Sequence, residues 1–132
     1  MYHLKVITMF IIFTTVLSGC ESWSEWTTQK QEEHEKKLFK QNVKLIDGNL
    51  SSVEEALTYF YRQAKEENRF GSLCQYYLAV CYYKLNDLSS AERSFNNYLE
   101  ISPDGEKIEE AKAYLEKIHI TLETSQRPWL NN

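Results

Sequence analysis

The sequence predicts an all-α domain, a stack of about five short helices. Glycine and proline are scarce, 4 and 2 among 132 residues, whereas all-β folds need many such turn residues. Apolar residues recur at intervals of three and four through several segments, which is the period of one helix face. Turn residues separate these segments at 47–49, 86–87 and 102–105. A chain of this length has room for one small core and not for two.

Residues 1–19 are expected to be an export signal and not part of the fold. Lys5 gives a positive start, and residues 6–17 form an apolar run of signal-peptide length. The run is shorter than the roughly 20 residues that a membrane-spanning helix needs. Leu17-Ser18-Gly19-Cys20 follows directly and resembles a bacterial lipobox. That resemblance implies cleavage before Cys20 and attachment of acyl chains such as palmitate to it, and the alternative is an uncleaved anchor with an incidental cysteine.

Lipidation would place the folded part outside the cytoplasm, because several acyl chains give stable anchoring. In bacteria with two membranes, an aspartate after the lipidated cysteine commonly retains a lipoprotein at the inner membrane. Glu21 stands there instead, which favours the outer membrane facing the periplasm, or the cell surface where there is a single membrane. Residues 20–28 would form a tether. Trp23 and Trp26 either rest at the lipid headgroups or pack on the helical domain.

The helical domain is expected to cover residues 29–124. A first helix over 29–46 carries apolar residues only in its C-terminal half, and Asp47-Gly48-Asn49 ends it with turn chemistry. In the next segment Ser52 and Glu55 have capping-box spacing. The residues that follow place their apolar side chains on one face of a second helix, which should end near Asn68.

Residues 72–105 hold the strongest pattern in the chain. Ala79 and Ala91 are small enough to let two helices approach closely, and Asn86-Asp87 provides a short turn, since asparagine tolerates the left-handed conformation. The residues that carry the pattern are Leu78, Ala79, Tyr82, Ala91, Phe95 and Pro103. Their spacing resembles a tetratricopeptide repeat, a helix–turn–helix unit of about 34 residues that stacks on its neighbours. Gln75 stands where that family usually carries an aromatic residue.

A last amphipathic helix is expected after residue 105. Its apolar residues are Ile108, Ala111, Leu115, Ile118 and Leu122. The rest of this helix is highly charged, as the terminal element of a repeat array must be, so we interpret it as a capping helix. Residues 125–132 form a tail, in which Arg127-Pro128-Trp129-Leu130 either folds back or binds something.

The sequence gives no sign of catalysis, and we predict no enzyme, cofactor, metal or small-molecule substrate. Cys74 and Cys81 lie on one predicted helix about 10 Å apart along its axis, beyond the roughly 7 Å that a disulfide spans. They are interpreted as buried core residues, with an intermolecular or redox role as the alternative. His34 lies between two glutamates but lacks convergent zinc ligands. A net charge of −4 offers no basic surface for nucleic acid.

In tetratricopeptide proteins the first helix of each pair lines a concave groove. The resemblance therefore implies that the partner-binding residues here are Leu73, Tyr76, Val80, Tyr83 and Lys84. Tyrosine suits such a surface because it offers a large contact area with a polar tip. The alternative is that Tyr76 and Tyr83 pack under the last helix or the N-terminal helix.

The function expected from these features is that of a membrane-tethered tetratricopeptide lipoprotein. It would bind another envelope or exported protein or peptide, as a scaffold or assembly factor. One alternative is a pilotin-like role in a secretion or pilus system. Another is a self-associating structural lipoprotein, against which the polar capping helix argues.

Overall fold

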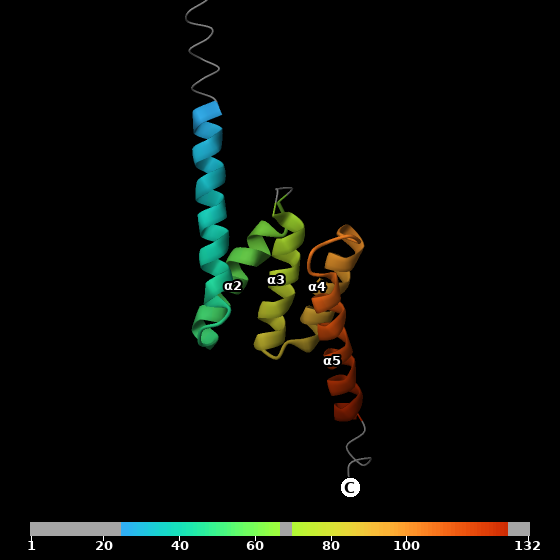
Figure 1. The fold of residues 1–132 in the computed structure, drawn as a ribbon. Coiled ribbons are helices and arrows are strands. Elements are labelled where there is room, and N and C mark those ends of the chain that lie inside the picture. Colours follow the sequence, from blue (N-terminus) through green and yellow to red (C-terminus); the bar gives the residue numbers. More distant parts are fainter. Residues whose placement is uncertain (1–24, 67–69, 127–132) are drawn as a thin grey trace, which may run out of the picture. The chain divides into compact units, whose positions relative to one another are not determined.

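The computed structural model describes residues 25–66 and 70–126, and this part of the chain is all-α (Figure 1). Its five helices are an N-terminal helix over residues 25–45, α2 (Leu50–Gln63), α3 (Gly71–Lys84), α4 (Leu88–Ile101) and α5 (Ile108–Gln126). The predicted fold class is confirmed. The described residues do not include the expected signal (1–19), residues 20–24 of the expected tether, of which Cys20 is the first, or residues 127–132.

By its contacts the chain divides after residue 40 into two units, 1–40 and 41–132. The described part of the first unit, residues 25–40, is helical and largely exposed. The N-terminal helix continues for five residues into the second unit, where it ends at 45 and is followed by a turn. The second unit holds the core and the helices α2 to α5.

The start of α2 differs from the prediction. Asn49 is the capping residue, since its side-chain Oδ1 accepts a hydrogen bond from the backbone N–H of Ser52 at 2.9 Å. The Ser52 hydroxyl donates to the same oxygen at 3.1 Å, so it does not serve as the cap of a capping box. Asparagine caps helices at least as well as serine, and here it stands one turn earlier. The helix also ends earlier than expected, at Gln63 and not near Asn68.

The turn between α3 and α4 has the predicted chemistry. Asn86 adopts φ 62°, the one positive φ at a described non-glycine residue. Asp87 then caps α4, with its Oδ1 accepting from the backbone N–H of Ser90 at 3.1 Å. At the other end of α4, Ser102 and Pro103 stop the helix as the sequence predicts.

The core lies where α3 packs against α2 and α4. Ala79 and Ala91 are fully buried, as expected for close helix contact, and so is Phe95. Tyr98 is also fully buried, and its hydroxyl accepts a hydrogen bond from the backbone N–H of Lys107 at 3.0 Å. The turn between α4 and α5 therefore closes around the tip of Tyr98.

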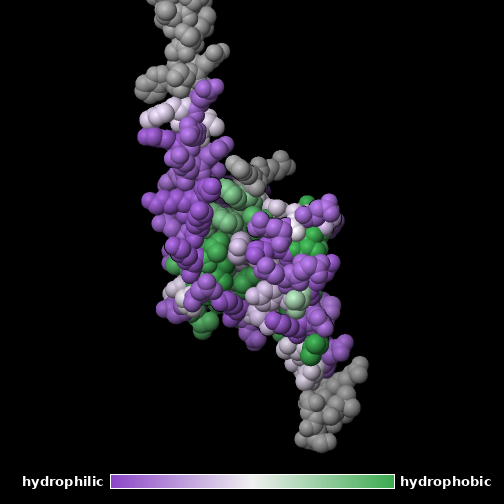
Figure 2. Space-filling model, in the orientation of Figure 1, coloured by the Kyte–Doolittle hydropathy of each residue, from purple (hydrophilic) through white to green (hydrophobic). Residues whose placement is uncertain are grey.

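The last helix packs against α4 and buries Ala111 and Ile118. In Figure 2 the surface over α4 and α5 is mainly hydrophilic, with isolated apolar spots. This agrees with the expected polar face of a capping helix. The helix is longer than predicted, because Ser125 and Gln126, assigned to the tail, are helical. The Ser125 hydroxyl donates to the carbonyl of Thr121 at 2.8 Å.

Cys74 and Cys81 are free and almost completely inaccessible, with exposed fractions of 1% and 0%. Burial raises the pKa of each thiol to about 12, so neither forms the reactive thiolate near neutral pH.

In the Cys20→Ser chain, we expect both thiols to react with a disulfide reagent only as fast as α3 opens, and completely in denaturant. A thiol titration with and without denaturant measures this. Immediate reaction in the folded protein, or a missing thiol in denaturant, would contradict the helical burial of both cysteines.

Candidate protein-binding groove

A hollow of about 280 Å³ lies in the second unit, between the end of the N-terminal helix, α3 and α5. These are alternate helices of the chain, the ones that form the inner face of a stack of helix pairs. We call this hollow the inner groove. Its lining consists of Val43, Ile46, Asp47, Tyr76, Tyr77, Val80, Lys84, Lys107, Glu110 and Tyr114. Three of the five predicted partner-binding residues, Tyr76, Val80 and Lys84, are among them.

Tyr76 forms the floor of the inner groove and is only 4% exposed. Its hydroxyl donates to Oε2 of Glu110 on α5 at 2.8 Å. Its ring packs 5.8 Å from the ring of Phe95 and 5.5 Å from that of Tyr98, measured between centroids. Burial, and then the hydrogen bond to Glu110, raise the pKa of Tyr76 far above its usual value. Tyr76 therefore packs against the last helix, which is the alternative that the sequence analysis gives for it, and its buried position corrects the prediction that it contacts a partner.

Val80 is buried in the same way, at 6% exposure, so the prediction that it contacts a partner is corrected as well. The Tyr76–Glu110 hydrogen bond and the Tyr83–Tyr114 ring contact bring side chains of α5 against this part of α3.

Tyr83 and Leu73 are half-buried and do not line the inner groove. The Tyr83 ring meets the edge of Tyr114 at a centroid distance of 4.9 Å. The Tyr114 ring in turn stacks on Phe95 at 5.0 Å. Tyr83 therefore packs against the last helix, which is the alternative that the sequence analysis gives for it. Leu73 lies near the start of α3 and is partly buried.

Lys84 forms one end of the inner groove. Its Nζ donates to the carbonyl oxygen of Ile46 at 2.8 Å and lies 3.6 Å from Oδ1 of Asp47. A lysine that binds a free carbonyl at a helix end satisfies one of the acceptors that the helix leaves unpaired. Lys84 thus fixes the turn after the N-terminal helix against the end of α3.

The α5 wall of the inner groove was missed by the sequence analysis. Lys107 Nζ donates to Oε1 of Glu110 at 2.8 Å. This hydrogen bond, with a second from the Tyr76 hydroxyl, lowers the pKa of Glu110. Lys107, Glu110 and Tyr114 are spaced by three and four residues, so the sequence could have predicted that they share one helix face. The sequence pattern places the charged residues of this helix on its solvent face, because the apolar stripe of the helix is mainly aliphatic.

No protein-family model matches this chain, and the comparisons with curated proteins and with solved structures also give no match. Its function therefore has to be argued from the geometry of the second unit and from the N-terminal motif.

Two properties of residues 25–66 and 70–126 bear on the kind of site that they can form. These residues contain no group of three or more His, Cys, Asp or Glu side chains placed to hold a metal ion. None of their helices combines the length and the apolar character needed to cross a bilayer. What the described residues do offer is a hollow lined by aromatic rings and a few charges.

Proposed function

We propose that this chain is a membrane-anchored lipoprotein of the tetratricopeptide type, whose helical domain binds another protein of the cell envelope as a scaffold or assembly factor. The observation that carries the proposal is the inner groove, which is walled by alternate helices of a helix–turn–helix stack. The lipobox-like Leu17-Ser18-Gly19-Cys20 supports the anchored location.

The lining of the inner groove favours a protein ligand over a small molecule. Its volume of about 280 Å³ is at or below the lower end of the range for small-molecule pockets, roughly 300–1,000 Å³. Tyr77 and Tyr114 present ring surface with polar tips, the combination that is enriched at protein interfaces. Lys107 and Glu110 place one charge of each sign beside them. A side chain or short segment of a partner fits this shape and chemistry.

Lipid attachment at Cys20 would give the inner groove its place in the cell. The acylated residue would hold the domain at the membrane surface, with the outer membrane facing the periplasm favoured by Glu21. The partner would then be an envelope or exported protein that reaches the same surface. Neither a cofactor nor nucleic acid is part of this proposal.

The test is site-specific photocrosslinking in cells, with a benzophenone side chain placed at Asp47 on the rim of the inner groove. The Asp47 side chain is 87% exposed and its ion pair with Lys84 is long, at 3.6 Å, so the substitution disturbs little. We expect a crosslinked adduct of defined mass from this position. The matched control is Glu116, an exposed residue of α5 outside the groove, which should give none. Equal crosslinking from both positions, or none from either, would contradict partner binding in the groove.

A further inference from the structure

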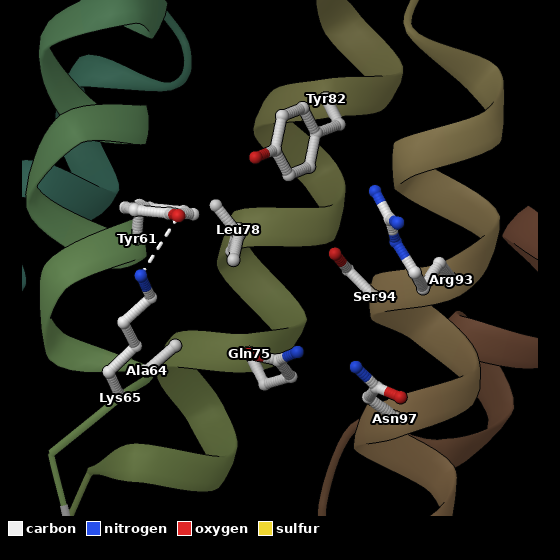
Figure 3. A pocket seen from close by; sticks show the side chains of 9 residues that line it. All are labelled: Tyr61, Ala64, Lys65, Gln75, Leu78, Tyr82, Arg93, Ser94 and Asn97. Atoms are coloured by element: carbon white, nitrogen blue, oxygen red, sulfur yellow. Dashed lines mark hydrogen bonds between the residues drawn. The ribbon is translucent and has the colours of Figure 1, made fainter.

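A second and larger hollow, of about 380 Å³, lies between α2, α3 and α4 and shares no residue with the inner groove (Figure 3). We call it the outer hollow. Tyr61 and Lys65 wall it from the end of α2, and Arg93 and Asn97 wall it from α4. Gln75, Leu78 and Tyr82 of α3 lie between these walls in Figure 3.

The outer hollow is positively charged in an acidic protein. Among the described residues, Lys65 and Arg93 line it and no acidic side chain does, although the chain has 19 acidic residues against 15 basic ones. Neither cation forms an ion pair with a residue in the described ranges. Lys65 Nζ donates to the neutral Tyr61 hydroxyl at 2.9 Å. Arg93 reaches the Ser90 hydroxyl only at 3.5 Å, so its guanidinium retains donors for a ligand.

Lys65 and Arg93 line the hollow from its opposite walls (Figure 3). Burial raises the pKa of Tyr82, and Tyr61 and Asp87 raise it further, while Arg93 and Lys65 both oppose that rise. Both cations therefore favour a negative charge in the part of the hollow that Tyr82 lines. Asp87 is the acid that acts on Tyr82, and its carboxylate is already engaged in capping α4.

Neutral groups of the outer hollow complement these charges. The side-chain amides of Gln75 and Asn97 extend toward each other from α3 and α4 (Figure 3). Each amide carries both a donor and an acceptor, as a peptide backbone does. Tyr61 and Tyr82 add ring surface on which a side chain can pack. Tyr61 is 48% exposed.

We propose that the outer hollow binds an extended acidic segment of a partner protein. Carboxylates of the segment pair with Arg93 and Lys65, and its backbone bonds to Gln75 and Asn97. The charges alone would also suit an anionic lipid headgroup, but the amide pair and the tyrosine rings match a peptide. The site is distinct from the inner groove and does not depend on lipidation of Cys20.

The test uses the full-length chain in a nonionic detergent and a fluorescent peptide, Ser-Glu-Tyr-Asp-Leu-Glu-Ser with blocked ends. The matched probe replaces its acids with Gln and Asn. We expect the acidic peptide to bind more tightly, and added salt to weaken it because partly exposed ion pairs are screened. Arg93→Gln should weaken binding about fivefold, the scale of one such pair. Lys112→Gln, with the same charge change on exposed α5, should leave it unchanged.

Three results would overturn the proposal. The first is equal affinity for the acidic and neutral peptides. The second is an equal loss in Arg93→Gln and Lys112→Gln, which would indicate attraction to net charge alone. The third is Arg93-dependent binding of a short-chain phosphatidylglycerol without binding of the peptide, which would assign the hollow to lipid. Circular dichroism of each variant confirms that its helices are retained.

Discussion

Replacing Tyr98 with alanine is expected to lower the free energy of unfolding by about 3–5 kcal/mol, the cost of truncating a buried aromatic residue. Tyr98 is fully buried, and its ring lies 5.5 Å from that of Tyr76, centroid to centroid. The substitution also removes the acceptor for the backbone N–H of Lys107, which closes the turn into α5. Denaturant unfolding followed by circular dichroism measures the change.

Two further variants show which part of Tyr98 matters. Tyr98→Phe keeps the ring and removes only the hydroxyl, so it should cost about 1–3 kcal/mol for the unsatisfied N–H. Ile101→Ala, at a position that is 58% exposed on the same helix, should change stability by no more than about 0.5 kcal/mol. If Tyr98→Ala costs no more than Ile101→Ala, the packing of α5 on α4 described above is wrong.

Replacing Cys20 with serine is expected to abolish acylation completely, because the proposed lipid would be attached through the cysteine sulfur, which serine lacks. The wild-type chain should incorporate labelled palmitate and sediment with membranes. The Cys20→Ser chain should incorporate none, which gel fluorography of labelled cells measures.

Cys74→Ala is the matched control for this experiment. It removes a buried thiol outside the proposed signal and should leave the label in place. Undiminished labelling of Cys20→Ser, or loss of label in Cys74→Ala alone, would refute the assignment of the lipid to Cys20.

The helices were predictable because their signals are local. Periodic apolar residues place α2 to α5, and Asn86 marks the turn between α3 and α4 through its tolerance of a positive φ. The start of α2 was misplaced because two capping signals overlap there. Asn49 and Ser52 are three residues apart, and only the structure shows that the serine hydroxyl donates to the asparagine.

The sites were less predictable, because they depend on which helices meet. The role of Tyr76 rests on a hydrogen bond to Glu110, 34 positions away in the chain. No local sequence pattern predicts that these two residues pair. The resemblance to a repeat pointed to α3, and Tyr76, Val80 and Lys84 of that helix line the inner groove. It did not reveal that Tyr76 and Val80 are buried.

The outer hollow had no signal in the sequence. Lys65 and Arg93 each look like an ordinary solvent-exposed charge at the surface of a helix. They line one hollow only because α2 and α4 both pack on α3.

The most direct test of the central claim, a helical domain held at a membrane by lipid on Cys20, is the intact mass of the wild-type chain extracted from membranes. We predict a species that begins at Cys20 and carries the added mass of its acyl chains. A membrane-bound chain that retains residues 1–19 without lipid, or a chain cleaved elsewhere and unacylated, would contradict the proposal.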